Sequence, residues 1–335
     1  MRRLPLGVCL LALLAAAVLG GCGSASSGAH SPRPATVVLD FQPNAVHAGI
    51  YAALARGYDV SAGARLHVVV PSASTDSIKL LETGRANFAI LDIHDLAIAR
   101  ERGESIVGIM ALVQRPLAAV IAAPAIRDPR ALHGQTVGVT GVPSDTAVLH
   151  SVVAGDGGDP ARVRTVTIGF NAVADLLAGR VKAATAFWND EGVTIERRRP
   201  GFHVFRVERY GAPSYPELVL CATASSLRSD PGLARGVVHA LVRGYRAVLA
   251  DPGAGARALE ARVPGLDPGL VKPQLQALLP AFRLPGGTVG ELDLASLRAW
   301  ARWEARFGIV RRPPNVAATF DARFLPRGAT TVPSH

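Results

Sequence analysis

Short runs of apolar and β-branched residues recur along the first two thirds of the chain, and stretches with helical spacing separate them. Such runs, bounded by polar turns, are typical of buried strands. The predicted strands are Thr36–Leu39, Leu66–Val70, Phe88–Leu91, Ile106–Val113, Leu117–Ala122, Thr136–Val139, Val163–Ile168, Ala183–Phe187 and Leu218–Ala222. Strands that alternate with helices predict an α/β fold with parallel sheets.

Helical spacing fills the intervals, and aspartate stands near several of the helix starts, where it favours the positive end of the helix dipole. The predicted helices are Ala45–Arg56, Asp76–Glu82, Asp95–Arg102, Asp145–Val153 and Val173–Leu177, followed past Ser229 by Pro231–Leu249, Asp267–Leu279 and Glu291–Phe307. Between Ser229 and the Pro-rich tail after Arg311 the chain is therefore expected to contain helices only.

The strands Ile106–Val113 and Leu117–Ala122 are joined by only three residues, and the later strand Leu218–Ala222 can run beside them. Two crossings of this kind would make a hinge between two lobes. We expect lobe one over 36–115, lobe two with the hinge strands over 116–222, C-terminal helices over 223–310 that pack across the lobes, and an irregular tail over 311–335.

An apolar run over residues 4–19 follows two arginines and ends in Leu-Gly-Gly-Cys at residues 19–22. The run is short for a membrane span and is typical of a signal peptide. The last four residues resemble a bacterial lipobox, in which the cysteine becomes lipidated. We predict a signal peptide over 1–21, lipidation at Cys22 and a flexible tether over 22–35, which would hold the protein on the extracytoplasmic face of the cell membrane. An ordinary secretory peptide is the alternative.

The chain has three cysteines, Cys9, Cys22 and Cys221. The first lies in the predicted signal peptide and the second in the lipobox, so no intramolecular disulfide is expected in the mature protein. Cys221 stands in an apolar strand, where a small core residue is a better interpretation than a nucleophile.

The net charge is +10, with 36 basic and 26 acidic residues. Apart from Arg197–Arg199 the basic residues are scattered and lack interleaved aromatics, which argues against nucleic-acid binding. We interpret them as solvated surface charge, with attraction to acidic lipid headgroups as the alternative.

The turn over residues 40–51 places three polar or aromatic side chains where a strand gives way to a helix. Asn44 can cap the helix, whose first turn carries His47 and whose second carries Tyr51. Such turns hold ligands in α/β proteins. We expect all three to face a crevice, although Asn44 as a plain cap and Tyr51 as a core aromatic are the structural alternatives.

A glycine turn over residues 138–145 leads from a strand into a helix whose free N–H groups can hold an oxygen or an anion. Its glycines do not have dinucleotide-fingerprint spacing, and Asp145 in the first helical turn disfavours a strongly anionic ligand. Ser144 is expected either to contact the ligand or to cap the helix.

Asp92 and His94 follow another strand and could suggest a metal site. Side chains alternate in direction along a strand end, and the sequence shows no second cluster of metal ligands, so we predict no metal and no cofactor. Asp95 is predicted to cap the helix that follows. The chain also lacks the Gly-x-Ser-x-Gly, His-Glu-x-x-His, Cys-x-x-Cys and Walker motifs, so catalysis has little support.

Trp188 stands beside Asn189 and Glu191 at the end of a predicted strand, in a chain with only three tryptophans. Its flat face suits stacking, and Glu191 can accept two hydrogen bonds from an amino-heteroaromatic ligand. Tyr215, just before the later hinge strand, adds a second aromatic edge. A surface loop with a half-buried Trp is the alternative.

Six motifs resemble, in order, the family of pyrimidine-precursor binding proteins of thiamine transport, which is related to the yeast pyrimidine synthase. They are Pro43-Asn44-x-x-His47-Ala48-Gly49-Ile50-Tyr51, Gln114-Arg115-Pro116-Leu117, Gly138-x-x-Gly141-x-Pro143, Gly169-Phe170-Asn171-Ala172, Phe187-Trp188-Asn189-x-Glu191 and Tyr210-Gly211-x-Pro213-x-Tyr215-Pro216. The resemblance spans about residues 36–225.

The resemblance implies a type II periplasmic-binding-protein fold that delivers an aminopyrimidine, such as hydroxymethylpyrimidine or its formylamino relative, to an ABC permease and its ATPase. By position, the ligand would stack on Trp188, and Glu191 would read its amino edge. The expected ligand-binding residues are Asn44, His47, Tyr51, Asp92, Gln114, Ser144, Trp188, Asn189, Glu191 and Tyr215.

Two departures from the family bear on function. Synthase relatives carry a cysteine-rich iron-binding stretch that this chain lacks, so binding is expected rather than synthesis. Around Asp92 family members more often carry a Tyr-containing sequence, so one wall of the pocket is expected to be more acidic. The alternatives are a sulfonate or nitrate receptor, which would need Arg or several helix N-termini at the pocket, and a pyrimidine-forming enzyme that uses His47.

Overall fold

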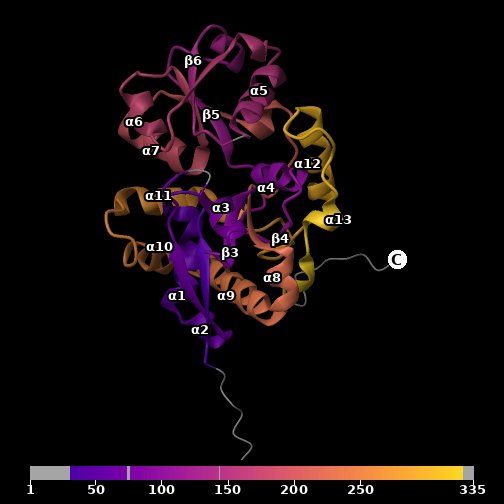
Figure 1. Ribbon diagram of the computed structural model, residues 1–335. Helices are drawn as coiled ribbons and strands as arrows, with labels where there is room; N and C mark the ends of the chain where they lie inside the picture. Colours follow the sequence, from indigo (N-terminus) through magenta and orange to yellow (C-terminus); the bar gives the residue numbers. More distant parts are fainter. Residues whose placement is uncertain (1–30, 74–75, 143, 327–335) are drawn as a thin grey trace, which may run out of the picture. The chain divides into compact units, whose positions relative to one another are not determined.

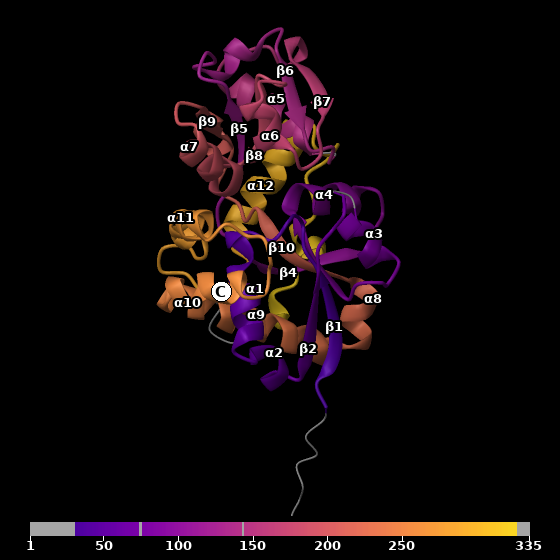
Figure 2. The ribbon, with the colours of Figure 1, turned by 90° about the vertical axis from the view of Figure 1, so that its left-hand side faces the viewer.

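The computed structural model describes residues 31–73, 76–142 and 144–326. The signal peptide, Cys22 and residues 22–30 of the tether, all predicted from the sequence, lie outside this part of the chain. From Pro32 onwards the chain forms one compact unit with two sheets, each covered by helices (Figures 1 and 2). The predicted α/β fold is confirmed.

The described strands are β1 (Arg33–Val38), β2 (Ala64–Val69), β3 (Phe88–Asp92), β4 (Ile106–Ala111), β5 (Ala118–Ala122), β6 (Thr136–Val139), β7 (Arg164–Thr167), β8 (Ala183–Phe187), β9 (His203–Arg206) and β10 (Leu218–Thr223). The α-helices are α1 (Ala48–Ala55), α2 (Tyr58–Ser61), α3 (Asp76–Glu82), α4 (Ile93–Glu101), α5 (Asp145–Gly155), α6 (Ala172–Leu177), α7 (Val193–Arg198), α8 (Ala224–Ser229), α9 (Pro231–Ala250), α10 (Pro252–Glu260), α11 (Pro268–Leu278), α12 (Leu294–Arg306) and α13 (Val316–Thr319).

The first sheet has the strand order β2-β1-β3-β10-β4 and forms the centre of the first lobe. β1, β2 and β3 are parallel, whereas β10 is antiparallel to both of its neighbours, with Leu220 opposite Ile90 and Met110. These three side chains are fully buried. A central strand buried on both faces requires a nearly continuous apolar run, which β10 supplies.

The second sheet has the order β7-β6-β8-β5-β9 and forms the second lobe. Here β5 is the antiparallel strand, with Val120 opposite Thr185 of β8 and Phe205 of β9. Each sheet therefore contains one antiparallel strand that borders a crossing between the lobes.

The chain passes between the sheets twice among the described residues. The first crossing covers 112–117, between β4 and β5, and the second covers 207–217, between β9 and β10. As a result β10, although late in the sequence, belongs to the first sheet. The two crossings meet because Leu112 N–H donates a hydrogen bond of 2.8 Å to Leu218 O.

Helix α9 packs directly on α1 of the first lobe. The approach is close enough that a Cβ atom on Gly244 would lie 2.0 Å from the carbonyl oxygen of Gly49. Beside this contact the Tyr245 hydroxyl donates a 2.8 Å hydrogen bond to Val46 O. Helix α11 contacts both lobes, through the turns at 45–47 and 188–192.

Several elements differ from the sequence prediction. The short helices α2, α7, α8 and α13 were not predicted, and α13 lies in the tail that was expected to be irregular. β9 was not predicted because it has only four residues and begins and ends with polar side chains. α10 was not predicted because Pro252 and two glycines interrupt its pattern, although Pro at the first turn and the Asp251 cap are favourable for a helix. β1 begins at Arg33, inside the segment expected to be tether.

Cys221 lies in β10, fully buried between β3 and β4, and burial raises the pKa of its thiol. It is the free cysteine of the described residues. A buried thiol with a raised pKa is unreactive, as expected for a core residue.

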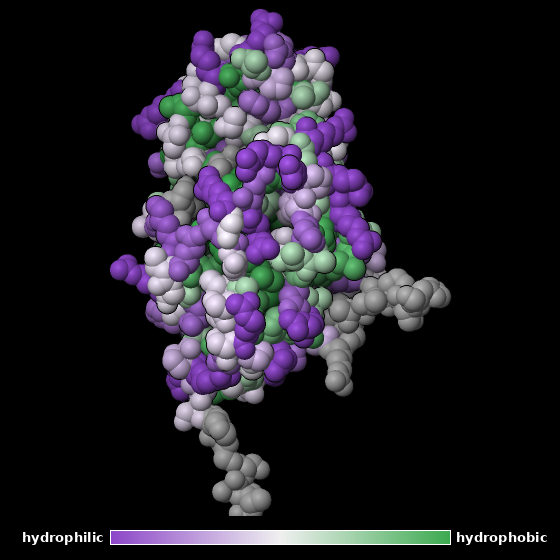
Figure 3. Space-filling model, turned by 45° about the vertical axis from the view of Figure 1, so that its right-hand side comes forward, coloured by the Kyte–Doolittle hydropathy of each residue, from purple (hydrophilic) through white to green (hydrophobic). Residues whose placement is uncertain are grey.

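On the face seen in Figure 3, hydrophilic residues are spread widely, with smaller hydrophobic areas between them. Among the residues that the structure describes, no helix combines the length and the apolar character that crossing a membrane would require.

Candidate functional site

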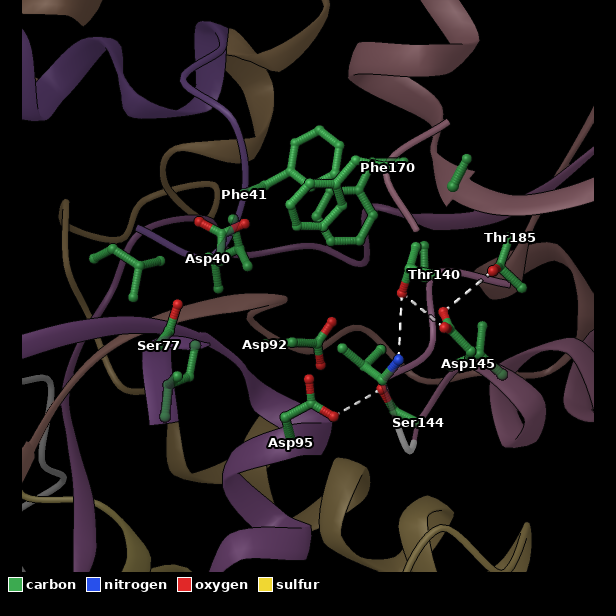
Figure 4. A pocket seen from close by; sticks show the side chains of 18 of the residues that line it. Asp40, Phe41, Ser77, Asp92, Asp95, Thr140, Ser144, Asp145, Phe170 and Thr185 are labelled. Atoms are coloured by element: carbon green, nitrogen blue, oxygen red, sulfur yellow. Dashed lines mark hydrogen bonds between the residues drawn. The ribbon is translucent and has the colours of Figure 1, made fainter. Parts of the chain in front are cut away.

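A cavity of about 100 Å³ lies between the lobes, at strand ends of both sheets (Figure 4). Its residues follow β1 and β3 in the first lobe and come from β5, β8 and the turns after β6 and β7 in the second. The lining is Asp40, Phe41, Ser77, Ile78, Ile90, Leu91, Asp92, Asp95, Ala118, Ala119, Thr140, Val142, Ser144, Asp145, Val148, Phe170, Thr185, Ala186, Phe187, Glu191 and Leu218. We call this the interlobe cavity.

The interlobe cavity is acidic and aromatic. Five lining residues carry carboxyl groups, namely Asp40, Asp92, Asp95, Asp145 and Glu191, and three are phenylalanines. None of the lining residues that the structure describes is Lys, Arg or His. A wall of this kind repels anions and suits a ligand with an aromatic face and several N–H donors.

Phe41 and Phe170 meet across the interlobe cavity. Phe41 follows β1 in the first lobe, Phe170 follows β7 in the second, and their ring centroids are 4.4 Å apart at an interplanar angle of 69°. Edge-to-face contacts of this geometry are favourable. The two rings therefore join the lobes at one side of the cavity (Figure 4).

His47 is fully buried and orients Asp40. Its Nδ1 accepts a 3.1 Å hydrogen bond from the backbone N–H of Asn44, so the ring proton is on Nε2, which donates to Asp40 Oδ1 at 2.9 Å. Asn44 in turn accepts the N–H of Val46 at 2.9 Å and completes a capping box. The predicted pair Asn44 and His47 thus reaches the cavity through a third residue, Asp40.

Asp95 and Ser144 form a hydrogen bond between the lobes. Ser144 Oγ donates to Asp95 Oδ1 at 3.0 Å, from the start of α5 to the first turn of α4. Burial and the nearby charge of Asp92 raise the pKa of Asp95 to about 8. This carboxyl group is therefore largely protonated at neutral pH.

Asp145 is the best-satisfied carboxylate of the cavity. It accepts hydrogen bonds from Thr140 Oγ1 at 2.7 Å, from Gly141 N–H at 2.8 Å and from Thr185 Oγ1 at 3.1 Å. Because its partners all belong to the second lobe, Asp145 fixes the glycine turn rather than presenting a free charge.

Glu191 lies in the π-helical turn Trp188–Gly192 after β8. It accepts the N–H of Phe187 at 3.1 Å, and burial, together with the charge of Asp190, raises its pKa to about 8. A π-helical turn is frequent at functional sites because it re-aims side chains. Here it turns Glu191 toward the cavity while Trp188 points elsewhere.

Trp188 lies outside the cavity lining. Its indole N–H donates a 2.9 Å hydrogen bond to Pro116 O in the first crossing, and the guanidinium carbon of Arg206 stands 3.9 Å from its ring centroid. One face of the indole is thus occupied by a cation. In this arrangement Trp188 anchors the first crossing to the end of β8.

Behind Asp92 lies a buried polar cluster. His94 contacts Glu304 of α12 through Nδ1 and the Tyr215 hydroxyl through Nε2 at 3.0 Å, and Glu217 Oε1 is 3.7 Å from Nε2. Burial lowers the pKa of His94, but the carboxyl groups of Glu304, Asp92 and Glu217 together outweigh this effect, and the pKa rises to about 10. Both ring nitrogens therefore carry protons and donate to their partners.

Asp92, His94 and Glu217 offer ligand atoms within 4.8 Å of one another, a spacing that a metal ion could bridge. A metal-binding histidine needs a free lone pair on one ring nitrogen. Both nitrogens of His94 are already engaged, by Glu304 and Tyr215. The cluster thus fits a protonated imidazole between carboxylates better than a cation site.

The structure divides the ten residues expected to bind ligand. Asp92, Ser144 and Glu191 line the interlobe cavity. The other seven lie behind the lining. Asn44 and His47 lie next to Asp40, and Tyr215 lies next to His94. Gln114 and Trp188 lie at the first crossing, Tyr51 lies in the core of the first lobe, and the side-chain amide of Asn189 is buried. Gln114 Nε2 donates to Glu291 O at 2.9 Å.

Several lining residues were not predicted, and Asp40, Phe41 and Phe170 are the most informative. Asp40 and Phe41 directly follow a strand in the turn already singled out, and Phe170 occupies the same kind of position after β7. The positions of these residues after strand ends would have been the signal, since ligands bind at the carboxyl ends of strands.

The two lobes with a cavity between them define a fold of the periplasmic-binding-protein kind. The alkanesulfonate-binding protein SsuA from Xanthomonas axonopodis pv. citri has this fold, with a TM-score of 0.69 at 16% identity, over 87% of this chain and 98% of that one. At this identity the likeness concerns the fold alone.

A profile of the family described as NMT1/THI5 like matches residues 44–254, and the chain belongs to this family. The formylaminopyrimidine-binding protein of Halalkalibacterium halodurans is 28% identical over 300 residues, which cover 87% of this chain and 91% of that protein. The riboflavin-binding protein RibY of Chloroflexus aurantiacus is 25% identical over 355 residues, covering 98% and 99%. The family resemblance seen in the sequence motifs is confirmed.

Proposed function

We propose that this protein is an extracytoplasmic solute-binding protein of an ABC importer and that its ligand is a thiamine pyrimidine precursor of the hydroxymethylpyrimidine or formylaminopyrimidine type. The observation that carries the proposal is the lining of the interlobe cavity, which has five carboxyl groups, three phenylalanines and, in the part of the chain that the structure describes, no basic side chain. An aminopyrimidine supplies the flat ring and the N–H donors that such a lining suits.

The same lining argues against the sulfonate and nitrate alternative. An anion in this cavity would meet no described Arg, Lys or His to neutralise its charge, and any ionised carboxylate beside it would repel it. Family membership and the identity to a formylaminopyrimidine-binding protein support the pyrimidine ligand. The cavity volume of about 100 Å³ suits one ring better than the three fused rings of riboflavin.

Within this proposal the ligand ring lies against Phe41 and Phe170, and its N–H groups donate to Asp92 and Glu191. Asp40 is held ready by His47 and Asn44 as a third acceptor. The family motifs assign the stacking role to Trp188, and that assignment remains a prediction that a variant at this position tests.

Export, lipidation at Cys22 and docking onto a permease with its ATPase complete the proposal. They rest on the signal-like N-terminus and the lipobox. Replacement of Cys22 by Ser should release the protein from the membrane into the medium or periplasm, as judged by fractionation. Retention of the variant on membranes would contradict lipid anchoring.

The ligand is tested by isothermal titration calorimetry on the protein from Pro32 onwards, with hydroxymethylpyrimidine, its formylamino analogue, riboflavin and taurine. Saturable heat with a pyrimidine and none with taurine is the expected result. Taurine binding alone would move the protein to the sulfonate receptors, and riboflavin binding alone to the flavin receptors. Formation of a pyrimidine by the purified protein without added ligand, detected by mass spectrometry, would instead support the pyrimidine-forming enzyme.

Variants locate the site. Asp92→Asn should weaken pyrimidine binding roughly tenfold, since a hydrogen bond to a charged group contributes about 1.5–3 kcal/mol. Glu191→Gln should weaken it less, since the pKa of Glu191 is raised to about 8 and a hydrogen bond between neutral groups contributes about 0.5–1.5 kcal/mol. Glu196→Gln, on the exposed side of α7, is the matched control and should bind as the unmodified protein does. Unchanged binding by both cavity variants would place the ligand elsewhere.

A further inference from the structure

Glu217 is fully buried where the two crossings meet, immediately before β10. Its Oε2 accepts the backbone N–H groups of Leu117 at 2.5 Å and Ala118 at 2.9 Å, and its carbonyl oxygen accepts Ile93 N–H at 2.9 Å. Two N–H donors stabilise the ionised form of a carboxyl group. Glu217 is therefore the residue at the crossings that is best placed to remain a carboxylate.

Asp92 stands between Glu217 and the interlobe cavity. Its side chain points into the cavity (Figure 4), and its Oδ1 accepts His94 N–H at 2.8 Å. The carboxyl oxygens of Asp92 and Glu217 lie within 4.8 Å of each other, and Glu217 Oε1 has no hydrogen-bond donor among the described residues. Glu217 is fully buried and Asp92 is only partly exposed, so ionising both carboxyl groups together in the empty cavity is unfavourable.

The groups around this pair favour a single shared proton. His94 and Asp95 face it from α4, Tyr215 from the second crossing and Glu304 from α12. Protonated His94 offsets the charge of Glu304. Burial raises the pKa of both Asp92 and Glu217, the charge of His94 opposes this for both, and the charge of Glu217 raises the pKa of Asp92 further. Because Glu217 has the two backbone donors, the proton belongs on Asp92.

We propose that Asp92 and Glu217 hold one proton between them in the empty cavity and that a ligand N–H donor which binds Asp92 displaces this proton to solvent. In the empty cavity Asp92 donates its O–H to Glu217 Oε1. When the ligand binds, the O–H bond of Asp92 breaks, the proton passes to the buffer, and the Asp92 carboxylate accepts the ligand N–H. Glu217 does not line the cavity, so it acts as a positioning residue.

This inference rests on the proposed function because it takes the ligand to be an N–H donor of the aminopyrimidine class. It adds that ligand affinity depends on pH through a residue that the ligand does not touch. Below the pH at which the pair loses its proton, each pH unit should change the affinity by up to about tenfold. The ligand's own titration contributes as well, and it is common to all variants.

The test is calorimetric titration of the purified protein with hydroxymethylpyrimidine from pH 6 to pH 8, in buffers of different ionisation enthalpy. The unmodified protein should release about one proton per ligand at neutral pH. In Glu217→Gln the amide oxygen can still accept the backbone N–H groups, and the amide N–H donates to an ionised Asp92. This variant should release no proton from the pair.

The decisive quantity is the ratio of the pyrimidine Kd of Glu217→Gln to that of the unmodified protein. It should change by up to about tenfold per pH unit, because only the unmodified protein must give up a proton. A residue that merely supports the fold would change Kd by one factor at every pH. A constant ratio, or an unmodified protein that releases no proton, would overturn the proposal. Glu208→Gln, at an exposed glutamate of the second crossing, is the control and should keep the unmodified pH dependence.

Asp92→Asn gives a second measurement should Glu217→Gln fail to fold. Its amide mimics the protonated acid, so binding should weaken and proton release from the pair should disappear.

Infrared difference spectra of the ligand-free protein separate this inference from the proposed function. The carbonyl band that a protonated Asp92 contributes at neutral pH should be missing from Asp92→Asn, whereas the bands of Asp95 and Glu191, whose pKa values are raised to about 8, should remain. If this band is present but the protein binds no pyrimidine, the shared proton is supported and the proposed ligand is wrong. Pyrimidine binding without the band would reject the pair.

Discussion

The rings of Phe41 and Phe170, one from each lobe, lie with their centroids 4.4 Å apart. The contact joins a turn after β1 to a turn after β7, and both side chains line the interlobe cavity. Any opening of the lobes at this side must separate the two rings, so the same residues that offer a surface to the ligand also hold the lobes together.

Removal of either ring should therefore favour the open arrangement. For Phe170→Ala we expect a larger radius of gyration without ligand, measured by small-angle X-ray scattering, and weaker pyrimidine binding. A double-mutant cycle with Phe41→Ala should give a coupling free energy of about 0.5–1.5 kcal/mol in unfolding experiments. Additive single effects would show that the contact contributes nothing.

Trp188→Leu separates two roles for the tryptophan. Loss of the indole hydrogen bond to Pro116 O should lower the free energy of unfolding by about 0.5–1.5 kcal/mol, while ligand affinity changes less than about threefold. A stacking role would instead weaken binding by about 1–3 kcal/mol. Chemical denaturation and calorimetry on the same variant distinguish these outcomes.

Phe170→Leu is the matched comparison for Trp188→Leu, because it removes an aromatic ring that lines the cavity. We expect this variant to lose affinity more than stability. If Trp188→Leu lost affinity and Phe170→Leu did not, the stacking surface would be the tryptophan.

His47→Gln tests whether His47 acts through Asp40. A glutamine at this position can preserve the capping box with Asn44, but it cannot reproduce the imidazole contact to Asp40. Pyrimidine affinity should fall roughly three- to tenfold while the midpoint of thermal unfolding changes little. In a protein that already carries Asp40→Asn, His47→Gln should cause no further loss of pyrimidine affinity. If the two substitutions weakened binding independently, His47 would not act through Asp40.

Stability should fall as pH rises from about 5 to 9. Burial raises the folded-state pKa of Asp95 and Glu191 to about 8 from 3.8 and 4.5, so the folded state binds these protons more tightly than the unfolded state. Their contribution is complete below pH 4 and is lost as pH rises through 8. The raised pKa of His94, about 10, acts in the same direction, and its contribution to stability is complete below pH 6.5.

Differential scanning fluorimetry of the ligand-free protein should show this trend as a fall of at least about 4 °C. Asp95→Asn cannot ionise and should flatten part of the slope. A melting temperature that rises over this range would mean that these carboxyl groups are ionised in the folded protein at neutral pH.

Gly244→Ala should destabilise the protein by about 1–3 kcal/mol or more, because its Cβ would lie 2.0 Å from Gly49 O and force α9 away from α1. Gly232→Ala, near the start of the same helix, is the matched control. There a Cβ meets only the end of the Arg33 side chain, at 3.2 Å, and the gain in helix propensity should leave stability unchanged or higher.

Much of the fold follows from local pattern. The runs around Val37, Ile90 and Val120 are buried strands because they are apolar, and Asp145 begins a helix because its side chain suits that position. The pairing of β10 with β3 and β4 could not be predicted with certainty, since it depends on where the chain returns after the second lobe. Residue spacing does not encode that return.

The site was harder to predict than the fold. Sequence motifs pointed to the correct turns, but within each turn the residue that reaches the cavity is set by backbone geometry. The π-helical turn after β8 aims Glu191 inward and leaves Trp188 against Pro116. At the first turn, His47 is buried and presents Asp40 instead. The position of Asp40 directly after β1 could have indicated it, whereas the inward direction of Glu191 depends on a π-helical turn that the residue types do not predict.

Cys221 has a practical consequence for measuring how the lobes move. Because this thiol is inaccessible inside β10, a maleimide dye added to the protein from Pro32 onwards should leave it unmodified. Two cysteines introduced on the outer surfaces of the lobes could then carry a donor and an acceptor fluorophore without prior removal of the native residue. Energy transfer between them would follow single molecules as they close around a ligand.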